Sequence, residues 1–132
     1  MQRRTLRHLR SKQQPEHHHC VYVVLLDSAV GKVRKVRVAN PERDRKKPCV
    51  YVGMTGLTPE ERFANHKEGT KAAWVVKRYG LRLLPEWYAH LNPMPYEAAA
   101  EMEKDLAEDL RRAGYTVTVS YTHLTLPTNR EV

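Results

Sequence analysis

Two short runs of the chain repeat one pattern of β-branched and aromatic residues. They are Cys20-Val21-Tyr22-Val23 and Cys49-Val50-Tyr51-Val52-Gly53. Runs of these residue types over four to eight positions are typical of β-strands. We therefore expect strands at 20–26 and 49–53, and we expect them to pair as neighbours in a small sheet.

The length and composition limit what can be built around these strands. A chain of 132 residues suits a single domain with one modest core. No apolar run approaches the ~20 residues that a membrane-spanning helix needs, so no membrane partner is expected. The first residues are rich in arginine and no apolar stretch follows them. This pattern predicts no secretory signal and a cytoplasmic location.

The cysteines and histidines offer little support for a disulfide or a zinc site. On antiparallel neighbouring strands, Cys20 and Cys49 would lie at opposite ends of the ladder, too far apart for a bridge. The sequence holds no CxxC pair. The adjacent histidines 17–19 fit a polar tail leading into the first strand better than a metal site.

Positive charge is concentrated in two segments. The formal net charge is +8; residues 1–19 carry five Lys or Arg and one acid, and residues 31–48 carry eight Lys or Arg and two acids. Clustered cations favour a polyanionic partner, most often nucleic acid. The alternative is a solvated basic surface, and charge alone leaves the two about even.

Local signals predict the remaining elements. Thr58 and Glu61 form a capping box with Pro59 at the first helical position, which predicts a helix to Glu68 that stops at Gly69. Valines alternating raggedly with Arg and Lys at 33–38 suggest an edge strand. Along the rest of the chain we expect a helix from Thr70 to 79, a strand at 81–84, a helical turn at 86–91, a long helix at about 95–113 closed by Gly114, and a terminal strand at 115–119.

Arg62 and His66 lie one turn apart on the capped helix and project from one face. The planar fork of arginine donates two hydrogen bonds to a phosphate and keeps its charge. A simply solvated polar face is the alternative. The helix follows directly from the strand of Tyr51 and Gly53, and this position favours a site.

Tyr22 and Tyr51 fall on the two strongest strands. A buried tyrosine is usually core filler whose hydroxyl reaches a partner. Either phenol could instead act as a base if a metal or cation lowered its pKa from about 10.

One carboxylate of the long helix stands out on a helical wheel. The apolar stripe is formed by Ala99, Met102, Leu106, Leu110 and Ala113. Glu103 lies about 60° from the centre of this stripe. A carboxylate at the edge of a buried stripe calls for a metal or an arginine. Asp109 flanks the other side and is the competing candidate.

These residues, in this order, resemble the GIY-YIG endonuclease superfamily. Cys20-Val21-Tyr22 stands for the first tripeptide and Tyr51-Val52-Gly53 for the second. The stretch 61–69, with Arg62, resembles the helix that follows. The stretch 96–106 resembles the metal-binding helix of the family, with Glu103 in the metal position. The resemblance covers about residues 20–115.

The resemblance implies an α+β fold with a small central antiparallel sheet, of about three strands, flanked by helices. It implies a metal-dependent DNA endonuclease or nickase. The implied roles are Glu103 holding Mg²⁺ or Mn²⁺, Arg62 stabilising developing charge, Tyr22 or Tyr51 positioning or deprotonating water, His66 assisting or contacting phosphate, and Gly53 letting the backbone approach DNA.

The chain departs from the family pattern at two places. Cys20 replaces the first glycine, and a basic insert at 27–48 replaces a short hairpin. We expect this insert to contact DNA. The expected nucleic-acid contacts are Gly53, Arg43, Arg45, Lys46, Lys47 and Lys67. Residues 1–19 are then a basic flexible arm, 20–118 the nuclease-like domain and 119–132 a non-native or disordered tail.

Two other functions stay open. The chain could be a catalytically inactive nucleic-acid-binding module with the same fold, or a partner subunit of a larger repair or mobile-element system. The choice between DNA and RNA, the oligomeric state and the target preference are not decided by the sequence.

Overall fold

The computed structural model describes residues 17–69 and 73–119. A sheet of four strands forms its centre, in the order β3-β1-β2-β4. The strands are β1 (Cys20–Leu26), β2 (Cys49–Thr55), β3 (Gly80–Leu83) and β4 (Thr116–Val119).

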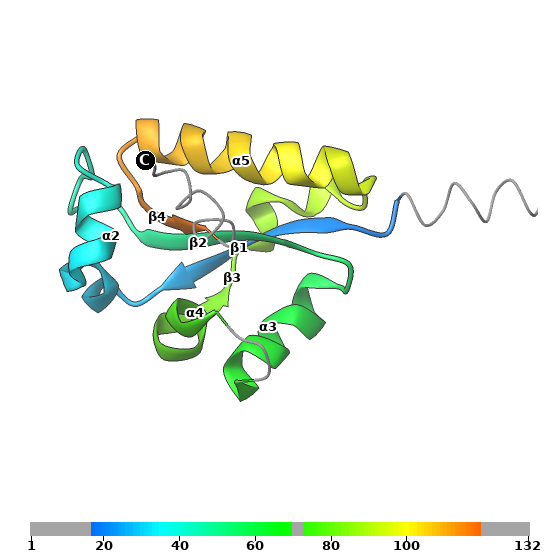
Figure 1. Ribbon diagram of the computed structural model, residues 1–132, viewed down its shortest axis with the longest axis horizontal. Helices are drawn as coiled ribbons and strands as arrows, with labels where there is room; N and C mark the ends of the chain where they lie inside the picture. Colours follow the sequence, from blue (N-terminus) through cyan, green and yellow to red (C-terminus); the bar gives the residue numbers. More distant parts are fainter. Residues whose placement is uncertain (1–16, 70–72, 120–132) are drawn as a thin grey trace, which may run out of the picture.

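Helices and short helical turns surround this sheet. The α-helices are α2 (Arg34–Ala39), α3 (Pro59–Glu68), α4 (Trp74–Tyr79) and α5 (Tyr96–Arg112). The 3₁₀ turns are η1 (Ser28–Lys32), η2 (Pro85–Trp87) and η3 (Ala89–Leu91). In the view of Figure 1, α5 runs along one side of the strands, α3 and α4 lie at the opposite side, and α2 stands at one end.

The expected pairing of the two repeated strands is confirmed. β1 and β2 are antiparallel, with Tyr22 opposite Gly53 and Val24 opposite Tyr51. Directly opposed residues share a face of the sheet, so both tyrosines project from the same face. Cys49 pairs with Leu26 at the far end of the ladder from Cys20, and both thiols are free.

The α+β class is confirmed, but a three-stranded antiparallel sheet is wrong. The sheet has four strands, and β4 pairs with β2 in parallel from Cys49–Thr116 to Val52–Val119. A parallel neighbour requires a crossover, and α5 carries the chain from β3 across to β4. The direction of β4 depends on this long-range path, which no local residue pattern encodes.

The two helices with clear end signals form as expected. Thr58 and Glu61 make a complete capping box, and Gly69 closes α3 at a φ of 90°. α5 ends just before Gly114, whose φ of 98° is one that other residues rarely adopt. The expected cap of the next helix, Thr70, lies outside the described residues, and α4 is described from Trp74.

The edge strand expected at 33–38 is wrong, because this segment is the helix α2. Val30 and Val36 are buried in the core, and Val33 between them is packed against it. Their spacing of three residues follows a helical period rather than the alternation of a strand. Val38, which suggested alternation, is 67% exposed.

Parts of the expected domain plan lie outside the described residues. These are residues 1–16 of the expected arm and residues 120–132 of the expected tail. His19 pairs with Met94 as an isolated bridge next to β1. Val119 ends β4 and so belongs to the sheet rather than to the tail.

Among the helices of the described ranges, none is long and apolar enough to cross a membrane.

Candidate active site

The sheet brings the two tyrosines together on one face. The ring centroids of Tyr22 and Tyr51 lie 6.1 Å apart with the rings tilted by 42°. Both side chains are buried. A Cβ at Gly53 would lie 2.7 Å from both Cζ and Oη of Tyr22, closer than non-bonded atoms can approach. Gly53 is therefore the residue that makes room for the Tyr22 phenol.

Helix α3 delivers His66 to the same face. His66 is fully buried, with 0% of its surface exposed. Its Nε2 lies 2.9 Å from the hydroxyl oxygen of Tyr22, and its ring meets that of Tyr51 edge-on at 5.7 Å. A solvated polar face is thus ruled out for His66, although its neighbours Lys67 and Glu68 are exposed.

The second ring nitrogen of His66 fixes the direction of this hydrogen bond. The backbone N–H of Ala73 donates to Nδ1 of His66 at 3.0 Å. Since an amide can only donate, Nδ1 must carry a lone pair, and the proton of the neutral ring sits on Nε2. Nε2–H therefore donates to the Tyr22 oxygen. Burial and the Arg62 charge lower the pKa of His66 to about 4, so the ring is neutral at neutral pH.

The Tyr22 hydroxyl is protonated at neutral pH for related reasons. Burial, and then the neighbouring Tyr51, raise the pKa of Tyr22 well above its usual value, while the charge and hydrogen bonding of Arg62 lower it. Burial outweighs the cation. Because the oxygen of Tyr22 accepts from His66, its own proton is directed to another acceptor.

Arg62 lies beside this pair. It is half-buried on α3, one turn before His66, and its charge acts on both His66 and Tyr22. The structure thus brings together Tyr22, Tyr51, Arg62 and His66, four of the five residues expected to be catalytic.

Glu103 lies deeper than the helical wheel suggested. It is 4% exposed and shares the buried face of α5 with Ala99 and Ala107. This places the carboxylate at the centre of the buried stripe rather than at its edge. Its helix contacts β1, β2 and β4, whereas α3 contacts β1, β3 and α4. The competing Asp109 is exposed and pairs with Arg112 at 3.0 Å, which is a surface role.

Glu103 fits a divalent metal as one protein ligand. No group of three His, Cys, Asp or Glu side chains gathers for a metal within 17–69 and 73–119. Mg²⁺ is commonly held by one or two carboxylates, with water and substrate phosphate completing its shell. A single buried glutamate is compatible with that mode, and it is not compatible with a closed structural site.

The residues expected to contact nucleic acid are separated by the fold. Arg43, Arg45 and Lys47 line one pocket of the insert, and Lys46 is exposed outside it. Lys67 is exposed, but its Nζ donates to the carbonyl oxygens of Lys77 at 3.1 Å and of Gly80 at 3.0 Å. These two bonds tie α3 to the end of α4. Tyr22 fills the space that a side chain at position 53 would take. The expected close approach of DNA to Gly53 stays a prediction.

Two contributors were missed by the sequence analysis. The Ala73 amide sets the tautomer of His66, and a backbone group leaves no trace in a side-chain pattern. Asn92 bonds both the N–H and the carbonyl oxygen of Val21 and so holds β1 next to Tyr22. No motif in the sequence singled out Asn92 for this role. No protein-family model, curated protein or solved structure matches the chain.

Proposed function

We propose that this chain is a metal-dependent DNA endonuclease or nickase with a GIY-YIG-like site. The observation that supports it best is the hydrogen-bonded series from the Ala73 amide through His66 to Tyr22, beside Arg62. A buried histidine held in one tautomer against a tyrosine is an arrangement that can orient a hydroxyl for chemistry.

In this proposal each side chain has a separate task. The Arg62 guanidinium stabilises the extra negative charge that develops on the phosphate. The Tyr22 phenol, held in place by the hydrogen bond that it accepts from His66, or the neighbouring Tyr51 phenol positions the attacking water. His66 acts through Tyr22, because its two ring nitrogens are engaged by the Ala73 amide and the Tyr22 hydroxyl. Tyr51 packs against both rings and sets their positions.

Glu103 would hold the Mg²⁺ or Mn²⁺ ion. When bound, such an ion neutralises charge on the scissile phosphate and helps the leaving oxygen depart.

The burial of the site supports a second candidate function, a nucleic-acid-binding module without activity. Tyr22, Tyr51, His66 and Glu103 are each at most 4% exposed. Such a group can serve as a polar core network that holds the sheet to α3 and α5.

Plasmid nicking separates the two functions. Supercoiled DNA is incubated with the protein and Mg²⁺ or Mn²⁺, and the relaxed form is measured. The endonuclease proposal predicts relaxation that Arg62→Ala and Glu103→Gln each abolish. The matched controls are Arg78→Ala and Glu101→Gln, which alter exposed residues of α4 and α5 and should keep activity.

Binding of the same DNA is measured by gel shift in parallel. Relaxation that survives both site variants would rule out this site. Binding without relaxation by the wild type would favour the inactive module.

A further inference from the structure

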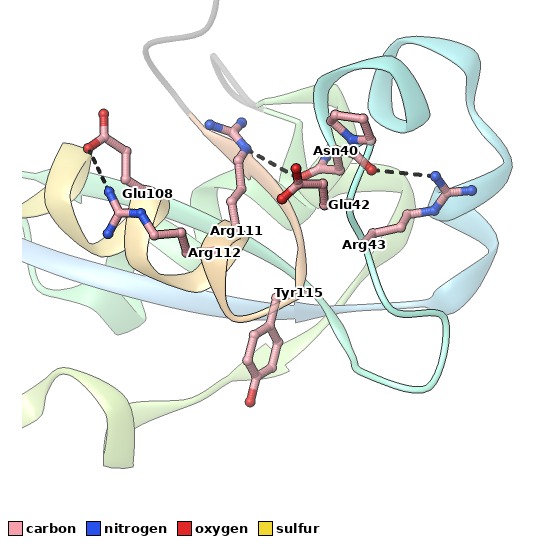
Figure 2. Close-up of a pocket in the computed structure, with 8 residues that line it drawn as sticks. Asn40, Glu42, Arg43, Glu108, Arg111, Arg112 and Tyr115 are labelled. Carbon is pink, nitrogen blue, oxygen red and sulfur yellow. Dashed lines mark hydrogen bonds and ion pairs between the residues drawn. The ribbon is translucent and has the colours of Figure 1, made fainter.

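The basic insert is anchored to the sheet through Asn40. The Asn40 side chain donates to the carbonyl oxygens of Val36 and Val117 and accepts from the Val117 N–H at 2.9 Å. Arg111 donates to the same side-chain oxygen at 3.2 Å, and Figure 2 shows this contact between α5 and the insert. The cations that follow Asn40 are therefore carried on a fixed support.

Beside this anchor lies a pocket of about 390 Å³. It lies between η1, α2 and the loop 41–48, with the first residues of β2 and β4 completing the wall. The described residues that line it are Ser28, Gly31, Lys32, Arg37, Arg43, Arg45, Lys47, Cys49 and Thr116. Its volume falls in the range of about 300–1,000 Å³ that is usual for ligand pockets.

The charged side chains that line this pocket are all positive. It holds five cationic side chains, and none of its described residues is acidic. Lys47 is held in place because its Nζ donates to the Ala113 carbonyl and lies 5.4 Å from the Tyr115 ring centroid. Like charges gathered around one cavity repel each other, and a bound anion relieves that repulsion.

The adjacent pocket in Figure 2 provides a contrast. It is smaller, about 230 Å³, and shares Arg43. It also contains Glu42 and Glu108, and Glu108 pairs with Arg112 at 3.9 Å. Two carboxylates offset most of the charge of three arginines there, so only the larger pocket has the character of an anion site.

We propose that the larger pocket binds phosphate groups of a nucleic acid strand. Three arginines supply planar forks that match phosphate oxygens, and two lysines add point charges. No aromatic ring is among the described lining residues, so the pocket has no surface on which a base could stack. Recognition is then of the backbone and not of the sequence. This inference does not depend on cleavage, and it adds Lys32 and Arg37 to the cations expected to meet DNA.

Two double variants of equal charge test the proposal. Arg37→Ala with Arg45→Ala removes two cations from the pocket. Arg34→Ala with Lys35→Ala removes two exposed cations of α2 that do not line it. Binding of a labelled duplex is followed by fluorescence anisotropy across a salt series, with EDTA present so that cleavage plays no part.

Each phosphate contact contributes about 0.9 to the slope of log affinity against log salt. We expect the double variant of the pocket residues Arg37 and Arg45 (the pocket pair) to reduce that slope by about 1–2. We expect the double variant of residues outside the pocket (the control pair) to reduce it by less than about 0.5. Equal reductions would mean a general charge effect and would overturn the proposal. Urea unfolding of both double variants checks that each is folded.

Inorganic phosphate distinguishes the source of the anion. Millimolar phosphate should displace the duplex from the wild type more than NaCl of equal ionic strength does, and the pocket pair should lose this difference. If phosphate binds the pocket while the pocket pair leaves duplex affinity unchanged, the pocket takes free phosphate only, and the proposal fails.

Discussion

The Tyr22 hydroxyl lies 2.9 Å from Nε2 of His66, while the other ring nitrogen of His66 is occupied by the Ala73 amide. The histidine therefore donates and the tyrosine accepts. His66 cannot take a proton without losing one of these two bonds. It is a fixed neutral donor, and its effect on chemistry passes through the orientation of Tyr22.

Removing the Tyr22 hydroxyl should cost stability as well as activity. Tyr22→Phe keeps the ring over Gly53 but leaves the buried Nε2–H of His66 without its acceptor. An unsatisfied buried donor costs about 1–3 kcal/mol. We expect that loss in urea unfolding, together with loss of plasmid nicking.

Tyr96→Phe is the matched control, because Tyr96 is 57% exposed and its change should stay within about 0.5 kcal/mol. If Tyr22→Phe is as stable as the wild type, the hydrogen bond to His66 is not formed.

The fold should lose stability as pH falls from 7 to 4, through His66. Burial and the Arg62 charge lower its pKa from 6.5 to about 4. The unfolded chain then binds the proton more readily than the fold does, so the contribution is complete above pH 6.5 and declines below it. The full difference is about 3 kcal/mol.

The measurement is urea unfolding at several pH values. His66→Gln is measured in the same way, because it lacks the His66 titration but keeps the Asp and Glu carboxylates. The difference between the two proteins is then the contribution of His66. An NMR titration of the His66 ring gives the pKa directly. A value near 6.5 would contradict the burial and charge argument. Arg62→Gln should raise the pKa of His66 because it removes the nearby cation.

Gly53→Ala should displace Tyr22. The added Cβ would lie 2.7 Å from the Tyr22 ring and hydroxyl, and the phenol is too rigid to yield without moving off His66. Overpacking of this kind costs about 1–3 kcal/mol. Gly31→Ala is the control, since the nearest atom to its new Cβ is Cys49 Sγ at 4.0 Å. Equal stability of the two variants would show that Tyr22 has room to move.

The parts of the fold that the sequence predicted are those with local signals. β1 and β2 are β-branched runs, and α3 has its capping box and its Gly69 stop. The helix α2 and the parallel direction of β4 were missed because both depend on what packs against these segments, whereas a strand at 115–119 was predicted. The valines of α2 bury against the core, and β4 is placed by the path of α5.

The burial of individual side chains was also not predictable from the sequence. A helical wheel weights large apolar residues, so Met102 and Leu106 placed the centre of the stripe beside Glu103. The structure buries the small Ala99 and Ala107 most deeply, and Glu103 lies between them. The burial of His66 could not be predicted for a similar reason. Only its contacts with Tyr22 and Ala73, which are made by the fold, show that this histidine is buried rather than solvated.

Asn40 is the residue on which the placement of the insert most depends. It is 2% exposed and its amide satisfies both backbone groups of Val117, at the edge of β4. Asn40→Ala removes the acceptor of the buried Val117 N–H and the closer donor to the Val117 carbonyl, which keeps only the longer contact from Arg111 Nη2 at 3.4 Å. We expect a loss of at least about 2 kcal/mol in urea unfolding.

A faster hydrogen exchange of the Val117 amide should accompany that loss, since its acceptor is gone. Asn40→Asp keeps the acceptor for Val117 and Arg111 and removes only the two donated bonds, so exchange at Val117 should stay slower than in Asn40→Ala. Asn65→Ala, on α3, controls for loss of an amide away from β4. The duplex affinity of Asn40→Ala, measured where it is still folded, then reports whether the basic pocket needs this anchor. Unchanged Val117 exchange in Asn40→Ala would show that the insert is held by other contacts.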